Sequence, residues 1–191
     1  MNTTERLVES YYRQKGHFTI TDAMVKDGNN RQFDILTIDN KASQYYHIEV
    51  NVTHDLRFVR PFDSISAEMR AKFFGVPKNK RPGNPNTDFA KGKSYLDAIK
   101  RTYNSLGMDF NLIKRVWCTW SLSFLDQANV DNWKEDMGRE FGLDPQNFEI
   151  LLFRDEVLTT LMRNIGTSNY SDELLRTLSL IDQHKGQTPF I

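Results

Sequence analysis

The sequence predicts an α/β fold, with a central sheet flanked by helices, and two observations favour it. Residues 32–38 and 46–52 alternate apolar with polar side chains and are rich in β-branched and aromatic residues, which is typical of strands. Segments with helical spacing precede and follow this pair, interspersed with further short strand-like runs. The chain has 191 residues, enough for one sizeable core, so we expect residues 1–191 to form a single domain.

The periodicity defines the elements in order along the chain. Helical spacing of apolar residues predicts helices, and alternation or short apolar runs predict strands. Asn2 with Glu5 three residues later suits a helix-capping pair, and Gly107 and Gly142 each follow the last periodic residue of a helix. We therefore expect helices over residues 3–15, 65–74, 89–106, 130–141, 155–165 and 171–184, and strands over residues 17–21, 32–38, 46–52, 112–122 and 148–153.

Composition and motifs exclude several classes of function. Basic and acidic residues number 25 each, so the formal net charge is zero, which weighs against a large non-specific DNA surface. The single cysteine, Cys118, excludes an internal disulfide and a cysteine-rich zinc site, and its alternation with apolar neighbours predicts a buried side chain. No Ser-His-Asp order, Walker loop or Gly-x-Gly-x-x-Gly motif supports a triad hydrolase, a P-loop enzyme or a dinucleotide enzyme.

The sequence carries no recognisable membrane or export signal. No apolar run approaches the roughly 18 residues that a membrane span needs. Residues 1–5 lack the basic and apolar regions of a secretory signal peptide. We therefore expect a cytoplasmic protein with no membrane partner.

The two central strand segments carry the residues of most chemical interest. Residues 39–43 between them are turn-forming, so the segments should pair as an antiparallel hairpin, with Ile35 opposite Ile48 and Asp34 opposite Glu49. Side chains alternate between the two faces of a strand, so one face should be core and the other polar. The expected core face comprises Phe33, Ile35, Ile48, Val50 and Val52, and the polar face carries Asp34, Glu49 and Asn51.

Two carboxylates directly opposite each other on a sheet need a compensating charge, because like charges in such pairs are destabilising. A divalent ion is the usual partner, and Mg²⁺ or Mn²⁺ suits hard oxygen ligands without a histidine cage. The alternative is a set of exposed polar residues on a solvated sheet face. His47, on the face of Glu49, and His54, just past the strand, are candidate bases or ligands, or else solvent-facing histidines.

The pattern of Asp34 followed on the next strand by Ile48-Glu49-Val50-Asn51 resembles the motif of the PD-(D/E)XK nuclease superfamily, the restriction-endonuclease-like fold. In that superfamily an Asp on one strand and Glu-x-Lys on the next bind Mg²⁺ beside the scissile phosphate. Asp34 matches the first acid and Glu49 the second, whereas Asn51 stands where the lysine is expected and no proline precedes Asp34. The element order over residues 3–122 also resembles the αβββαβ core of these domains, which implies a mixed sheet, with residues 123–191 as a C-terminal helical extension.

The resemblance implies a metal site and its catalytic residues. Asp34, Glu49 and the carbonyl of Val50 would bind Mg²⁺ or Mn²⁺, and Asn51 would occupy the position of the catalytic lysine. Glu5, on the first helix, is the candidate for an acid that completes the cluster, unless it serves only as a capping residue.

Basic residues elsewhere supply candidates for the missing charge and for contact with nucleic acid. Lys91 and Lys93 are candidates for a catalytic lysine supplied from a neighbouring helix, with solvated surface charges as the alternative. Lys78, Lys80 and Arg81 lie in a proline-rich stretch that is either a surface loop or an arm that contacts phosphates.

Two functions from different classes remain open. The first is a Mg²⁺-dependent endonuclease that hydrolyses DNA phosphodiester bonds, with a homodimer among the arrangements that the resemblance implies. The second is a catalytically impaired nuclease-like domain that binds nucleic acid or a protein partner. The two acids Asp34 and Glu49 favour the first, whereas Asn51 and the zero net charge favour the second.

Overall fold

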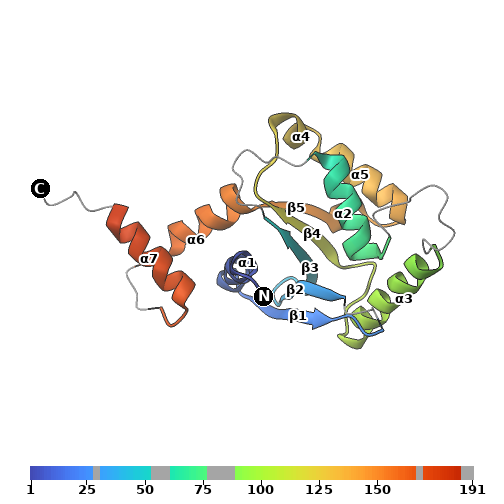
Figure 1. Cartoon of the computed structure of the whole chain (residues 1–191), viewed down its shortest axis with the longest axis horizontal. Coiled ribbons are helices and arrows are strands. Elements are labelled where there is room, and N and C mark those ends of the chain that lie inside the picture. The colour runs from blue at the N-terminus through green and yellow to red at the C-terminus, as the bar shows by residue number, and fades with distance from the viewer. Residues whose placement is uncertain (28–30, 53–60, 77–88, 167–169, 186–191) are drawn as a thin grey trace, which may run out of the picture.

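A five-stranded sheet in the order β1-β2-β3-β4-β5 forms the centre of the protein in the computed structural model (Figure 1). β1, β2 and β3 pair antiparallel, and β4 and β5 continue the sheet parallel to β3. The strands are β1 (His17–Met24), β2 (Gln32–Asp39), β3 (Gln44–Asn51), β4 (Lys114–Thr119) and β5 (Phe148–Leu152). The structure describes residues 1–27, 31–52, 61–76, 89–166 and 170–185, and of residues 89–94, 124–125 and 185 it describes the backbone only.

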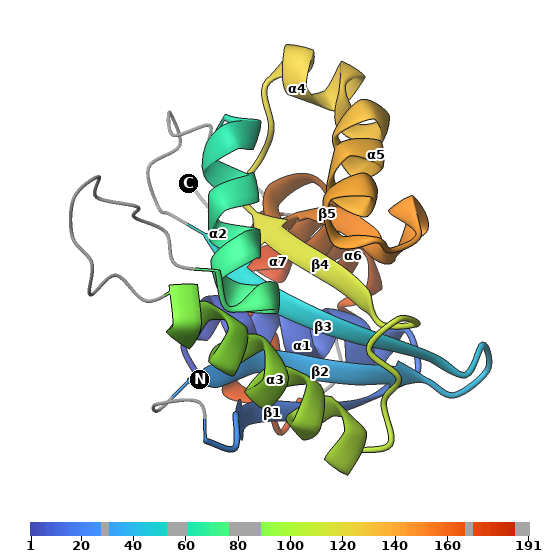
Figure 2. The same ribbon diagram turned by 90° about the vertical axis from the view of Figure 1, so that its right-hand side faces the viewer.

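Helices cover both faces of this sheet, as Figure 2 shows. α1 packs on one face, with the C-terminal helices on the same side, while α2, α3 and α5 pack on the other. Within the described ranges, no helix has the length and apolar character needed to cross a bilayer. The helices are α1 (Thr3–Gln14), α2 (Phe62–Phe74), α3 (Phe89–Ser105), α4 (Phe124–Ala128), α5 (Val130–Phe141), α6 (Thr159–Asn164) and α7 (Glu173–Lys185), with a 3₁₀ turn at Pro145–Asn147 and a π-helix at Phe153–Leu158.

The predicted α/β class, with a mixed sheet flanked by helices, is confirmed, and each predicted element has a counterpart whose ends differ by a few residues. Cys118 is fully buried, as expected. The segment after residue 122 is more than a helical extension, because β5 pairs with β4 and completes the sheet. α4 was not predicted, and the single helix expected over residues 155–165 is a π-helix followed by α6.

The predicted register of the central hairpin is also confirmed, with Ile35 opposite Ile48 and Asp39 opposite Gln44. The turn is stabilised by the Asp39 carboxylate, which accepts hydrogen bonds from the backbone N–H groups of Lys41 and Ala42. The regular β2–β3 ladder ends at Ile35 and Ile48, one residue before Asp34 and Glu49 would pair.

The predicted facing of Phe33 is wrong. Its ring stacks on Tyr103 of α3 at 5.1 Å between centroids, whereas Ile35 and Ile48 belong to the core on the α1 side. The regular pleat is interrupted at Asp34, whose side chain accepts the Val50 N–H beyond the end of the ladder. The regular alternation of side chains between the two faces of the sheet therefore breaks at Asp34.

The contact between α2 and α3 provides a test of the packing around α2. Gly75 ends α2 with φ +69, and a Cβ added there would lie 2.6 Å from Tyr95 Cβ; Gly142 ends α5 with φ +64 and has nothing within 4 Å. We expect Gly142→Ala to lower the free energy of unfolding by about 1–2 kcal/mol, because the left-handed backbone conformation is the only source of strain there. Gly75→Ala should cost about 1–3 kcal/mol more, because overpacking adds to the backbone strain. Urea unfolding measures both, and equal losses would contradict the close contact.

Candidate active site

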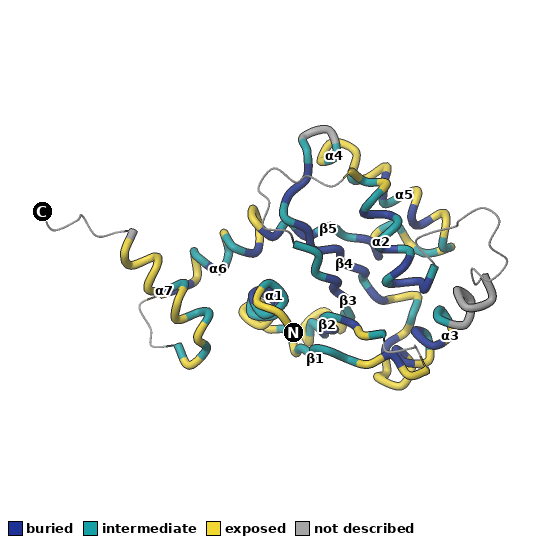
Figure 3. Tube along the Cα trace, viewed as in Figure 1, coloured by how far each residue is buried: buried dark blue, intermediate teal, exposed yellow. Residues whose placement is uncertain are grey.

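Glu49 lies on β3, which is one of the buried central strands of the sheet (Figure 3). Its side chain points to the face of the sheet that α2 and α3 cover. It is 1 % exposed. Asp34 enters from β2 with its side chain 18 % exposed, and its Oδ2 accepts the Val50 N–H at 2.8 Å. The two predicted acids are thus brought together where β2 and β3 cease to pair.

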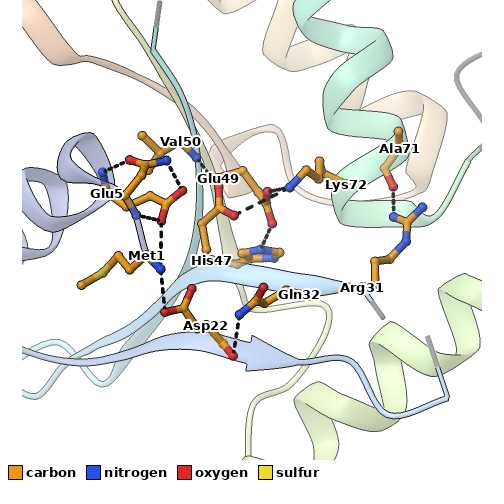
Figure 4. Close-up of polar contacts among 12 residues, drawn as sticks. Met1, Glu5, Asp22, Arg31, Gln32, His47, Glu49, Val50, Ala71 and Lys72 are labelled. Atoms are coloured by element: carbon orange, nitrogen blue, oxygen red, sulfur yellow. Dashed lines mark hydrogen bonds and ion pairs between the residues drawn. The ribbon is translucent and has the colours of Figure 1, made fainter. Parts of the chain in front are cut away.

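Lys72 of α2 supplies the cation that faces both acids. Figure 4 shows its ammonium group beside the Glu49 carboxylate. Its Nζ lies 2.5 Å from Glu49 Oε2 and 3.7 Å from Asp34 Oδ1. α2 buries Met69 and Phe73 in the core beneath it, which fixes the helix that carries Lys72. The Lys72 side chain is 37 % exposed, so part of it reaches solvent.

Sequence reasoning missed Lys72, although a signal for it exists. Its chain neighbours Ala71 and Phe73 are both buried, and residues 65–74 form a mainly apolar helix. Lys72 stands directly between the apolar residues Ala71 and Phe73, and charged side chains are seldom surrounded by core residues unless they are paired. The sequence alone gave no indication of which acid it would meet.

His47 is buried beside Glu49, so the alternative of a solvent-facing histidine is wrong at this position. Its Nε2 lies 2.8 Å from Glu49 Oε1, and its Nδ1 lies 2.5 Å from Tyr103 Oη. Burial holds the pKa of His47 well below its usual value, so the imidazole is neutral at pH 7. Glu49 is therefore contacted at one oxygen by a neutral histidine and at the other by a charged lysine.

Burial raises the proton affinity of both acids, and the charge of Glu49 adds to this effect at Asp34. Burial, followed by the Glu49 charge, raises the pKa of Asp34 to about 6, against the opposing effect of Lys72. Burial also raises the pKa of Glu49, while Lys72 acts to lower it. Burial alone would lower the pKa of Lys72, but attraction to Glu49 and Asp34 leaves it raised, so Lys72 is charged at neutral pH.

The raised pKa of Asp34 makes stability depend on pH. The folded chain binds this proton more tightly than the unfolded chain, so stability is lost as pH rises from the ordinary value of 3.8 through about 6. Asp34→Asn removes that loss. Between pH 5 and pH 8 we expect its stability relative to wild type to improve by about 1 kcal/mol, measured by urea unfolding at both pH values. A pH-independent difference would mean that Asp34 titrates normally.

The ligand atoms available at this site are oxygens, which is the type that a hard divalent cation binds. Two adjacent carboxylates whose charged forms repel each other would be relieved by a cation, and carboxylate and carbonyl oxygens are the ligands that Mg²⁺ and Mn²⁺ prefer. Asp34 and Glu49 are the acidic ligands available, with the Val50 carbonyl as the predicted third donor. Among the residues that the structure describes, no group of three or more His, Cys, Asp and Glu side chains could hold a metal ion.

Glu5 forms the capping pair that the sequence suggested. Its carboxylate accepts the Asn2 backbone N–H at 2.7 Å and the Asn2 side-chain amide at 2.6 Å, and the Asn2 side chain accepts the Glu5 N–H in return. Figure 4 shows it close to Met1, at the N-terminal end of α1. The structure thus gives Glu5 a capping role; its predicted catalytic role stays a prediction.

The remaining predicted residues are placed less fully. Asn51 ends β3, partly buried, and is paired in register with Thr119 of β4. Lys91 and Lys93 lie in the first turns of α3, where only the backbone is described. The predicted phosphate-contacting residues and the second histidine lie outside the described residues: Lys78, Lys80, Arg81 and His54.

Arg31 is a second cation near the site that sequence reasoning did not identify. It precedes β2, donates a hydrogen bond from Nη1 to the Ala71 carbonyl in α2, and stacks its guanidinium 5.0 Å from the Tyr95 ring centroid. The hydrogen bond ties the start of β2 to the residue next to Lys72. Two positive side chains therefore border the pair of acids on the α2 side.

Comparisons of the chain with protein-family models, with curated proteins and with solved structures found no match. The fold and site by themselves define a class: a mixed α/β domain in which two neighbouring strands bring a pair of carboxylates to a lysine from a covering helix.

Proposed function

We propose that this protein is a divalent-metal-dependent endonuclease that hydrolyses DNA phosphodiester bonds, with a restriction-endonuclease-like arrangement of its core. The observation that carries the proposal is the position of Lys72, whose Nζ faces both Asp34 and Glu49. The motif resemblance lacks a lysine at Asn51, and Lys72 supplies from α2 the charge that the strand does not.

Asp34, Glu49 and the Val50 carbonyl are the groups that would hold Mg²⁺ or Mn²⁺. Such an ion, when bound, lowers the pKa of a water molecule and stabilises negative charge on a phosphate. Side chains of the protein would perform the other steps. Lys72 is part-exposed, so its ammonium group can exchange Glu49 for a phosphate oxygen and donate hydrogen bonds to it as charge develops there.

Asp34 and Arg31 keep this arrangement in place. The hydrogen bond from Val50 N–H fixes the Asp34 carboxylate against β3, which holds the two acids in register where the strands part. The bond from Arg31 to the Ala71 carbonyl holds the last turns of α2 against the sheet. Both contacts limit how far Lys72 can move relative to the acids.

Cleavage of supercoiled plasmid DNA by the purified protein tests the proposal. We expect cleavage with Mg²⁺ or Mn²⁺, none with EDTA, and loss of activity in Asp34→Asn and Glu49→Gln, because each removes one of the two charged donors. Glu140→Gln is the matched control, since this acid pairs with Arg70 at the surface between α2 and α5. Equal cleavage by wild type and both site variants would point to a contaminant or a different site.

One observation favours the second candidate, a nuclease-like domain that binds nucleic acid or a protein without cutting. Both oxygens of Glu49 are already contacted by His47 and Lys72, and Glu49 is almost fully buried. In that case the acid–lysine set would serve to join α2 to the sheet. DNA binding that survives in Asp34→Asn, without cleavage by wild type in any metal, would select this function.

A further inference from the structure

A row of buried polar contacts runs from α3 to Glu49. Tyr103 Oη lies 2.5 Å from His47 Nδ1, and His47 Nε2 lies 2.8 Å from Glu49 Oε1. Tyr103 and His47 are fully buried and Glu49 is 1 % exposed. The three side chains are thus closed off from bulk solvent, and each needs a hydrogen-bond partner inside the protein.

The chemistry of the three groups fixes the direction of both hydrogen bonds. A neutral imidazole has one N–H donor and one acceptor nitrogen. A carboxylate only accepts, so Glu49 requires the N–H on Nε2 of His47. Nδ1 is then the acceptor, and the Tyr103 hydroxyl, whose pKa is raised by burial, donates to it. This is the assignment that pairs every group in the row.

Aromatic rings hold His47 in the orientation that this row requires. Its ring lies 4.4 Å from the Phe33 centroid and 4.6 Å from that of Phe73, which meets it edge-on. Phe33 in turn stacks on Tyr103. Phe73 follows Lys72 in α2, so the same packing fixes the imidazole and the helix that carries the lysine.

We propose that Tyr103 and His47 are positioning residues that fix Glu49 Oε1 by a hydrogen bond of defined direction, which leaves Oε2 turned toward Lys72 and Asp34 to receive a divalent cation. This inference rests on the proposed function, because it assumes a metal site at Asp34 and Glu49. Hydrogen-bond partners of metal ligands typically alter metal affinity about 10–100-fold when they are removed. The row therefore sets how strongly the acids bind the ion.

Nitrogen-15 NMR of histidine-labelled wild-type protein tests the direction of the row without any metal. The protein has four histidines, and the signals that disappear in His47→Gln identify those of His47. We expect a pyrrole-type, protonated Nε2 and a pyridine-type, unprotonated Nδ1. A proton on Nδ1, or on both nitrogens at pH 7.5, would overturn the assignment.

Titration with Mn²⁺, followed by electron paramagnetic resonance, tests the effect on the acids. Tyr103→Phe loses one hydroxyl and keeps its ring against Phe33, and should weaken Mn²⁺ binding about tenfold. His47→Leu loses the donor to Glu49 and should weaken binding by up to about 100-fold, and His47→Gln, which keeps an N–H donor, should recover much of it. Tyr12→Phe is the control, since this buried tyrosine packs in the core on the α1 side.

The outcomes separate the inference from the proposed function. Wild-type affinity in Tyr103→Phe, or equal losses in His47→Leu and His47→Gln, would overturn the positioning role while leaving the metal site intact. Absence of Mn²⁺ binding by wild type would overturn the proposed function and the metal-positioning role with it, and the NMR tautomer would then decide the hydrogen-bond row by itself.

Discussion

Lys72→Met should reduce metal-dependent DNA cleavage roughly 10²–10³-fold, the usual cost of removing one well-placed donor to charge that develops in a transition state. Lys72 is the cation 2.5 Å from Glu49 and 3.7 Å from Asp34, and methionine keeps the length of its side chain without the charge. Lys72→Arg should retain part of the activity, because it keeps a cation with a different shape. Initial rates of plasmid nicking measure both.

The assay needs saturating Mn²⁺, because Lys72 also acts to lower the pKa of Glu49. Without that charge Glu49 holds its proton more strongly, and the metal would bind more weakly at neutral pH. At saturation the loss reports on the reaction itself. Lys134→Met, a lysine of α5 paired with Asp131 within its own helix, controls for the removal of a positive charge and should cleave as wild type does. An unchanged rate in Lys72→Met would remove Lys72 from the mechanism.

Asn51→Lys should rescue Lys72→Met by at least about tenfold, because it returns a cation to the active site from the strand instead of the helix. Asn51 lies two residues beyond Glu49 on β3, so both side chains emerge on the same face of the sheet. In wild type the same change should help little or reduce cleavage, because a second cation would crowd the site. The two backgrounds, compared under identical conditions, form a double-mutant cycle.

Two results would contradict this interpretation. A large gain from Asn51→Lys in wild type would mean that Lys72 does not supply the missing charge. Lack of rescue in Lys72→Met, with correct folding shown by an unchanged circular dichroism spectrum, would mean that a lysine on β3 cannot replace Lys72. Asn51→Gln controls for the longer side chain without the charge.

Local sequence signals were sufficient to predict the hairpin and its acids. Turn chemistry at residues 39–43 and alternation on both sides set the register of Ile35 with Ile48. This register places Asp34 and Glu49 next to the end of the ladder, where both face Lys72. The hairpin pairing depends on residues close together in the chain, where periodicity and turn preference act directly. The same reasoning placed the capping pair of Asn2 and Glu5 at the start of α1.

Contacts between distant segments were not predictable in the same way. Lys72 reaches Glu49 only because α2 crosses the sheet at one particular place, which depends on how Met69 and Phe73 pack. A solvent-facing His47 was one of two alternatives, because His47 shares a polar face of the strand with Glu49. α2 and α3 cover that face. The sequence pattern of one strand does not reveal which helices pack on it. Whether a polar face is buried, and which residues it then contacts, is therefore known only from the folded structure.

The most direct measurement of the proposed metal site is an anomalous difference map from crystals of wild-type protein soaked in Mn²⁺. We expect one strong peak, from an ion within bonding distance of carboxylate oxygens of both Asp34 and Glu49, with the Lys72 ammonium group released from Glu49 Oε2. Asp34→Asn crystals treated in the same way should show no such peak. A map without a peak at these acids, with Lys72 still paired to Glu49 at saturating Mn²⁺, would contradict the proposed metal site.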